Sequence, residues 1–295
     1  MKLGKLFAMA LGAFAGLGLA SANAQTIVVG GKNFTEQQLL ADMTSQLLKA
    51  KGFQVDIRAG MGSAAVRSAM ENGQIDAYWE YTGTSLITYN KVTERMSPEE
   101  TYAKVKELDA EKGIVWLDPS AANNTYALAM RKPDAEKHGI KTLSDLAGKI
   151  NGGEALTFAS NAEFYARADG LKPLEAEYGF EFGRENIKRM DTGLVYQALR
   201  DGQVDVGLVF ATDGRIPAFD FVVLEDDKNY FPAYALTPTV RKDVLDNNPK
   251  LAEHLNALSA KLDDATMAKL NASVDVEKKS IENVAESFLK EQGLI

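Results

Sequence analysis

The chain alternates between short apolar runs and longer amphipathic stretches. Residues 26–30 form an apolar run typical of a buried strand, and residues 36–51 repeat apolar side chains with helical periodicity. Residues 53–58 alternate like a strand. Residues 64–71 read as a helix after a Gly-rich turn, and residues 75–79 return to strand character. This β-α-β-α-β order predicts a largely parallel sheet with helices on both faces.

The same alternation resumes further along the chain. Strands are expected at residues 126–130, 156–159 and 204–210. Helices are expected at residues 143–147, 173–178 and 193–200. The region after Asn248 is predicted to be helical and to end in an amphipathic helix over residues 276–292.

Two stretches repeat one pattern of helix end, Gly stop and new strand. Residues 69–77 read AMENGQIDA, and residues 198–206 read ALRDGQVDV. An aromatic residue stands twelve positions after the first Ala of each stretch, Tyr81 in one and Phe210 in the other. The repeat indicates two lobes of similar topology.

A second repeat marks the connection between these lobes. Residues 126–134 and residues 234–243 both begin with Tyr and end with Arg-Lys shortly before an acidic residue. We interpret them as paired strands that cross between the lobes. The predicted division is residues 25–127 with 232–295 for lobe I and residues 128–231 for lobe II.

Four aromatic residues fall at strand ends or crossings under this interpretation: Tyr81, Tyr126, Phe210 and Tyr234. Ligands of open α/β sheets bind beyond the carboxyl ends of the strands, which here means the cleft between the lobes. Aromatic faces attract organic cations, and a quaternary ammonium group is the best guest for such a cage. An ordinary packing role for each single aromatic remains the alternative.

The first 24 residues have the pattern of a secretory signal peptide. They combine a basic start, an apolar run over residues 6–20 and an Ala22-Asn23-Ala24 ending. We expect cleavage before Gln25 and export to the periplasm, with an uncleaved membrane anchor as the alternative. The chain has no Cys, so no lipid anchor is expected.

Composition removes several function classes. The chain has 33 basic and 41 acidic residues, a formal net charge of −8, which argues against a nucleic-acid binder. The lack of Cys excludes thiolate metal sites and Cys nucleophiles, and the two His residues, His138 and His254, stand far apart in sequence. We therefore expect no catalytic site, no cofactor and no metal. With 295 residues the chain is long enough for about two domains.

Four motifs resemble those of one family, the substrate-binding proteins of ABC importers for glycine betaine, choline and related solutes. They are residues 31–37 (GKNFTEQ), 79–84 (WEYTGT), 123–128 (NNTYAL) and 210–216 (FATDGRI). The resemblance implies a two-lobed α/β periplasmic-binding-protein fold of type II, each lobe a mostly parallel sheet flanked by helices. It also implies a ligand held in the interlobe cleft.

The resemblance further implies roles for individual residues. Tyr81, Tyr126, Phe210 and Tyr234 match the aromatic box around the trimethylammonium group. By the same resemblance, Lys32, Thr84 and Arg167 occupy the positions that grip the ligand's carboxylate in relatives. Charge-assisted bonds from Lys and Arg suit such a group. A solvated charge for Lys32 and an internal ion pair of Arg167 with Asp169 are the alternatives.

Two positions depart from the pattern of relatives. Phe210 is Tyr in several of them, so a hydroxyl is lost here. Asn124, two residues before Tyr126 and on the same side of an extended strand, is Asp in some relatives.

The sequence thus predicts a monomeric periplasmic receptor that delivers a quaternary ammonium solute to a permease in the inner membrane. Glycine betaine, choline, carnitine, proline betaine and a sulfonium all stay open as ligands. Two other classes also stay open. One is an enzyme acting on a small amine, for which no nucleophile–base pair is found. The other is a receptor read by a chemosensory partner.

Overall fold

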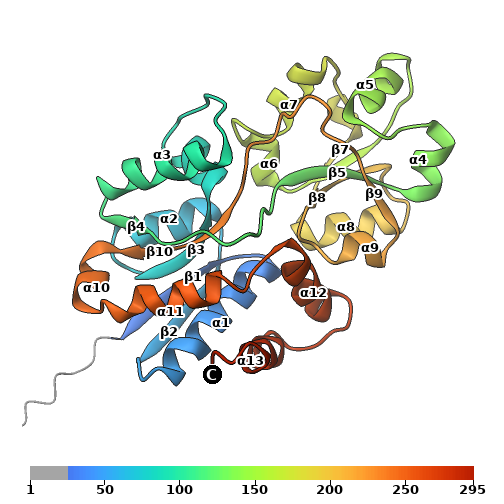
Figure 1. Ribbon diagram of the computed structural model, residues 1–295. Helices are drawn as coiled ribbons and strands as arrows, with labels where there is room; N and C mark the ends of the chain where they lie inside the picture. The colour runs from blue at the N-terminus through green and yellow to red at the C-terminus, as the bar shows by residue number, and fades with distance from the viewer. Residues whose placement is uncertain (1–25) are drawn as a thin grey trace, which may run out of the picture.

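The computed structural model describes residues 26–295, and two five-stranded sheets form the centres of its two lobes (Figure 1). The predicted signal peptide lies outside the described residues. The sheet of lobe I has the spatial order β2 (Val55–Met61), β1 (Ile27–Lys32), β3 (Ala77–Tyr81), β10 (Leu236–Arg241) and β4 (Ile114–Trp116). The sheet of lobe II has the order β7 (Ile187–Arg189), β6 (Phe158–Ser160), β8 (Val206–Phe210), β5 (Tyr126–Arg131) and β9 (Phe221–Val223).

The two sheets share one connectivity. In lobe I, β2, β1 and β3 are parallel and β10 runs antiparallel to β3. In lobe II, β7, β6 and β8 are parallel and β5 runs antiparallel to β8. The repeat in the sequence therefore places β3 and β8 at equivalent positions, which agrees with two lobes of similar topology.

Each sheet is mixed but mostly parallel, as the sequence predicts: four of its five strands run in one direction, and β10 or β5 runs against them. The carboxyl ends of β3 and β8 meet at the interlobe cleft, and the chain enters β5 and β10 from that same end. A strand that starts at the cleft runs away from it, so β5 and β10 must be antiparallel to the strands that finish there.

Helices cover both sheets. In lobe I they are α1 (Thr35–Ala50), α2 (Ser63–Glu71), the π-helical turn η1 (Thr84–Tyr89), α3 (Pro98–Ala110), α10 (Lys242–Asn247), α11 (Lys250–Ser259), α12 (Asp264–Asp275) and α13 (Ile281–Glu291). In lobe II they are α4 (Lys132–His138), α5 (Leu143–Asn151), α6 (Ala162–Ala166), α7 (Leu171–Tyr178), the 3₁₀ turn η2 (Arg184–Asn186), α8 (Thr192–Arg200) and α9 (Arg215–Ala218).

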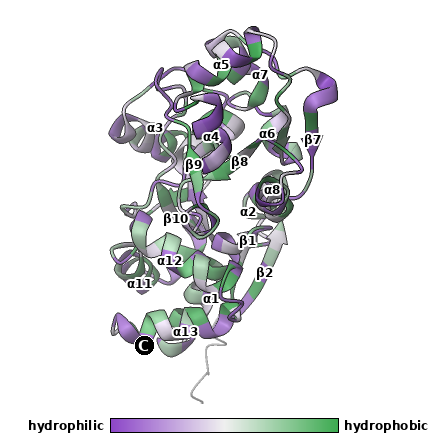
Figure 2. Cartoon of the chain, turned by 90° about the vertical axis from the view of Figure 1, so that its right-hand side faces the viewer, coloured by the Kyte–Doolittle hydropathy of each residue, from purple (hydrophilic) through white to green (hydrophobic). Residues whose placement is uncertain are grey.

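Helix α1 shows how the apolar pattern becomes packing. Its apolar positions Leu39, Leu40, Met43 and Leu47 are buried against the sheet and the C-terminal helices, as the helical periodicity predicts. Hydrophobic residues likewise dominate the central strand β8 and the edge strand β9 of lobe II (Figure 2). Burial of these faces is the main favourable contribution to folding.

The C-terminal helix is shorter than the sequence predicts. Helix α12 ends at Asp275, and α13 begins only at Ile281. The Ser280 side chain caps α13 by accepting a hydrogen bond from the Asn283 backbone N–H. Lys278 between them has a φ of 62°, which a continuous helix does not allow. Residues 277–280 are Glu, Lys, Lys and Ser, and the buried apolar positions of α13 begin after this polar stretch.

The two crossing segments do not pair along their length. β5 belongs to the sheet of lobe II and β10 to that of lobe I. They come together where the chain passes between the lobes. There Asn123 and Ala235 form an antiparallel bridge, the Asn124 backbone N–H donates to the Tyr234 carbonyl, and the Tyr126 and Tyr234 rings are in contact. The expected lobe boundaries stay a prediction.

None of the helices in residues 26–295 has the length and apolar character needed to cross a bilayer.

Candidate functional site

The four aromatic residues singled out in the sequence converge on one small cavity between the lobes. Tyr126 lies at the centre, with ring centroids 5.2 Å from Phe210 and 5.4 Å from Tyr234, the latter edge-on. Tyr81 lines the same cavity, whose volume is about 40 Å³. The convergence follows from topology. Tyr81 and Phe210 end the equivalent strands β3 and β8, Tyr126 pairs with Phe210, and Tyr234 lies two residues before Leu236, which pairs with Tyr81.

A fifth ring belongs to this cluster and was not among the predicted site residues. Phe34 stacks between Tyr81 and Phe210, at centroid distances of 6.3 and 5.8 Å. It is half-buried and lines both the small cavity and the larger cleft outside it. Its position inside the first motif, GKNFTEQ, was the available signal.

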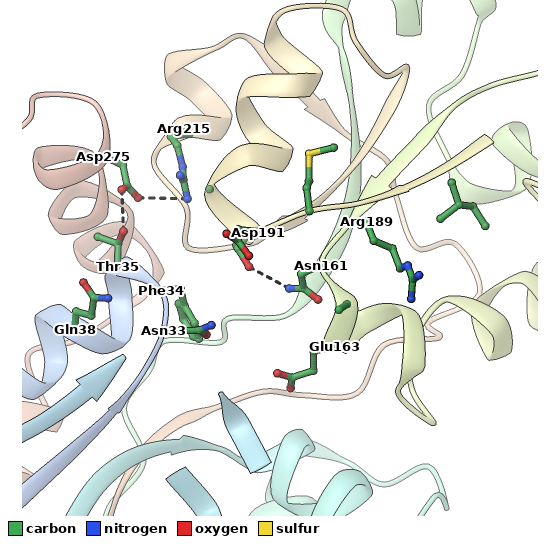
Figure 3. Close-up of a pocket in the computed structure, with 15 residues that line it drawn as sticks. Asn33, Phe34, Thr35, Gln38, Asn161, Glu163, Arg189, Asp191, Arg215 and Asp275 are labelled. Carbon is green, nitrogen blue, oxygen red and sulfur yellow. Dashed lines mark hydrogen bonds and ion pairs between the residues drawn. The ribbon is translucent and has the colours of Figure 1, made fainter. Parts of the chain in front are cut away.

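The larger cleft has a volume of about 1100 Å³ and separates the two lobes (Figure 3). Asn33 and Phe34 of lobe I face Asn161 and Glu163 of lobe II across it (Figure 3). Asp275 of α12 accepts a hydrogen bond of 2.8 Å from Thr35 and pairs with Arg215 of lobe II at 3.3 Å. The small cavity thus opens toward a polar cleft that both lobes line.

The three tyrosines of the cavity are neutral phenols. Burial raises the pKa of Tyr81, Tyr126 and Tyr234 above the ordinary value for tyrosine, and neighbouring carboxylates raise it further for Tyr81 and Tyr234. The Tyr81 and Tyr234 hydroxyls donate to Glu36 and Asp169, and the three rings present uncharged π faces to the cavity.

Lys32 lines the cavity, but its charge is balanced inside lobe I. Its Nζ lies 2.5 Å from Glu80 Oε1 and 4.8 Å from the centroid of the Tyr81 ring. Glu80 is fully buried and also accepts hydrogen bonds from the Tyr78 hydroxyl and the Tyr81 backbone N–H. Lys32 is thus neither the solvated charge of the alternative reading nor an unpartnered cation.

Arg167 does not line the cavity, but it reaches its edge. Both terminal nitrogens lie 3.5 Å from Thr84 Oγ1, and the guanidinium carbon lies 5.4 Å from the centroid of the Tyr126 ring. Asp169 binds the guanidinium with two bonds of 2.6 Å, and Glu163 adds one of 3.1 Å. The internal pair with Asp169, left open from the sequence, is therefore present, and it leaves Arg167 next to Thr84.

Asn124 lines the cavity, and its amide turns toward the interior. Its Nδ2 donates a 2.8 Å hydrogen bond to the buried carboxylate of Glu36. Gln37 is also buried and donates to the Trp79 carbonyl at 2.9 Å and to the Tyr81 hydroxyl at 3.1 Å. The first motif therefore builds the support behind the aromatic rings.

The two histidines lie away from this cavity. His138 bonds Glu154 at 2.6 Å in lobe II, and His254 packs edge-on against Phe53. Neither lines the cavity. Within residues 26–295, no three His, Cys, Asp or Glu side chains are grouped so as to hold a metal ion.

Comparison with known proteins identifies the class. The family model described as the substrate-binding domain of the ABC-type glycine betaine transport system matches residues 25–291. The chain belongs to this family. Members of this substrate-binding family are not enzymes, and the chain is an extracytoplasmic component that binds a quaternary ammonium solute for ABC import.

Curated relatives cover nearly the whole chain. A glycine-betaine-binding protein of Pseudomonas aeruginosa is 46% identical over 93% of this chain and 90% of its own. The glycine betaine-binding protein YehZ of Escherichia coli is 34% identical over 99% of both.

Solved structures of the family share the fold. The crystal structure titled as a glycine betaine/carnitine/choline ABC transporter has a TM-score of 0.74 and 29% identity, covering 91% of this chain and 99% of that one. Apo YehZ has a TM-score of 0.68 and 33% identity, covering 92% of this chain and 100% of that one. The predicted resemblance and the two-lobed binding-protein fold are confirmed.

Proposed function

We propose that the protein binds the trimethylammonium group of a solute such as glycine betaine or choline between the rings of Tyr81, Tyr126, Phe210 and Tyr234. The observation that carries this proposal is the convergence of these rings from both lobes on one cavity. Each ring face adds ~0.5–2 kcal/mol of attraction for such a cation. Phe34 supplies a further ring wall on the side of the cleft.

Ligand entry requires these rings to separate. A cavity of about 40 Å³ has room for only a few water molecules. The rings come from both lobes, so a hinge motion of the lobes enlarges the cavity and closing them surrounds the ligand. The crossing at Asn123 and Ala235 is the place for the hinge.

We assign the ligand's carboxylate, when it has one, to Arg167 and Thr84. Asp169 is buried, bonds Arg167 twice and also accepts from the Tyr234 hydroxyl, so it stays in place. Glu163 makes one longer bond to Arg167 Nη1, and its side chain is 36% exposed. The incoming carboxylate therefore takes the Nη1 position from Glu163. Because Glu80 balances the charge of Lys32, Lys32 contributes to ligand binding indirectly, through its contact with the Tyr81 ring.

The solute is passed to the permease of an ABC importer in the inner membrane. The signal-peptide pattern of residues 1–24 supports a periplasmic location, and the protein acts as a monomer. The lobe boundaries that accompany this mechanism are residues 25–127 with 232–295 and residues 128–231.

Calorimetric titration tests the proposal. The mature chain, unfolded and refolded to remove bound solute, is titrated with glycine betaine and then with choline. We expect saturable binding of at least one of them with no chemical change in the ligand. Tyr126→Ala should weaken binding strongly, because Tyr126 contacts two other rings of the cage. Failure of both ligands to bind at millimolar concentration would overturn the proposal.

A further inference from the structure

A buried carboxylate lies directly behind the aromatic rings. Glu36, in the first turn of α1, is 3% exposed. Its Oε1 accepts hydrogen bonds of 2.7 Å from the Tyr81 hydroxyl and 2.8 Å from Asn124 Nδ2. Its Oε2 accepts from the Thr212 hydroxyl and, at 3.0 Å, from Asn271 Nδ2. Both oxygens are thus saturated by neutral donors.

These donors come from separate parts of the fold. Tyr81 ends β3, Asn124 lies in the crossing, Thr212 follows β8 in lobe II and Asn271 lies in α12. Asn271 also donates to the Thr212 carbonyl at 2.9 Å. Glu36 therefore fixes the position of one cage ring and of the neighbouring Asn124, and it links them to lobe II and the C-terminal region.

The charges around the cavity leave Glu36 without a cationic partner. Lys32 is paired with Glu80, and Arg167 is paired with Asp169. Within residues 26–295, no Lys, Arg or His forms an ion pair with Glu36. An ionised carboxylate held away from water costs free energy unless a positive charge balances it.

A quaternary ammonium group in the cage would supply that missing positive charge. It has no N–H to donate, so it senses a carboxylate only through the field and through polarised neighbours. The Tyr81 hydroxyl donates to Glu36, and such a bond makes the phenol ring more electron-rich toward the cavity. The same field acts through a water-poor interior, where charges interact more strongly than in water.

We propose that Glu36 is the counter-charge for the ammonium group of the ligand and acts through Tyr81 and Asn124 without touching the ligand. The inference rests on the proposed function and adds a positioning and selectivity residue to it. Glu36 makes the site discriminate a permanent cation from a neutral group of the same shape.

The test compares choline with 3,3-dimethylbutan-1-ol, in which carbon replaces the quaternary nitrogen. In Glu36→Gln, we expect choline affinity to fall roughly tenfold or more. Affinity for the neutral analogue should change by less than about threefold, because only the charge differs. An equal loss for both ligands would overturn the inference and reduce Glu36 to a packing role.

A second variant moves the charge instead of removing it. In Glu36→Gln/Asn124→Asp, the amide and the carboxylate exchange places across the 2.8 Å hydrogen bond. Choline affinity should return to within about threefold of wild type. A double variant that folds but shows no preference for choline over the analogue would contradict the proposal. This comparison holds even if Glu36→Gln alone does not fold.

Asn271→Ala is the matched control. It removes one hydrogen bond from the far side of the same carboxylate and leaves the contacts with Tyr81 and Asn124. It should weaken both ligands by the same factor. If the wild type binds neither choline nor glycine betaine, the proposed function itself is refuted. If the wild type binds choline and Glu36→Gln keeps the same ratio of choline affinity to analogue affinity, only the counter-charge role is refuted.

Discussion

The Tyr234 hydroxyl donates a 2.5 Å hydrogen bond to Asp169, the same carboxylate that holds Arg167 with two bonds of 2.6 Å. One buried acid thus positions a wall of the aromatic cage and the guanidinium at its edge. The two ends of the proposed ligand are therefore coupled through the protein as well as through the ligand.

Tyr234→Phe should separate these two effects. The ring remains, so choline affinity should stay within about threefold of wild type. Glycine betaine should lose more, because Asp169 and with it Arg167 lose one of their constraints. Tyr234→Ala removes the ring and should weaken both ligands by about 2- to 30-fold. Calorimetry on the four combinations checks this, and equal losses in Tyr234→Phe would disprove the coupling.

Glu163→Gln should favour ligands that carry a carboxylate. Glu163 now occupies Arg167 Nη1 at 3.1 Å, and the neutral amide competes less for that position. We expect the affinity for glycine betaine to rise several-fold relative to that for choline. Glu136→Gln, on an exposed turn of α4, is the control and should leave the ratio unchanged. A lower ratio in Glu163→Gln would place the carboxylate elsewhere.

Choline binding should weaken as the pH falls. Burial raises the pKa of Glu36 above its ordinary value of 4.5, although four hydrogen bonds oppose the shift. The ionised form balances the ligand, so affinity should decrease as the pH drops through this raised pKa, and choline itself does not titrate there. The titration should be absent in Glu36→Gln.

Other ionisable groups near Glu36 set the controls for this pH profile. Tyr81 contacts Glu36 as a neutral phenol. Asp213, Arg215 and Asp275 line a separate cavity, next to the aromatic one, that Glu36 also lines. Burial also raises the pKa of Asp275, so Asp275→Asn should retain the pH dependence if Glu36 causes it.

The stability of the ligand-free protein should depend on pH in the opposite direction from choline affinity. The folded state binds this proton more tightly than the unfolded chain does. The free energy of unfolding contributed by Glu36 therefore decreases as the pH rises from about 4.5 through the raised pKa. Melting curves of wild type and Glu36→Gln over this range measure the difference, and parallel curves would show that Glu36 does not titrate there.

Gly83→Ala should disturb the cage by volume alone. A Cβ at this position would lie 2.7 Å from the Ala233 carbonyl oxygen and 2.9 Å from atoms of the Tyr234 ring. The backbone is helical there, so the ring must move. We expect roughly tenfold weaker binding of either ligand, consistent with partial loss of one ring wall. Gly148→Ala, where a Cβ meets nothing within 4 Å, should bind like wild type.

Much of the architecture follows from short-range pattern. The buried face of α1, with Leu39, Leu40 and Met43, could be predicted from the sequence because neighbours on one helix face are three and four positions apart. The repeated helix, Gly and strand pattern correctly places Tyr81 and Phe210 at equivalent strand ends. The same reasoning fails at residues 276–280, which were predicted as the start of the last helix but form the break between α12 and α13.

Two lobes, the strand ends that carry the aromatic residues and, through the motifs, the family could all be predicted from the order of residues. The pairing of charged side chains could not, because it depends on how the folded elements pack. Lys32 pairs with Glu80, which is 48 residues away in sequence. Glu36 accepts hydrogen bonds from four residues, and the most distant of them, Asn271, is 235 residues away. Phe34 lies between two rings that belong to different lobes. Periodicity reports which face of an element is buried. The partner on the other side of that burial is set by how distant elements pack, which no local pattern encodes.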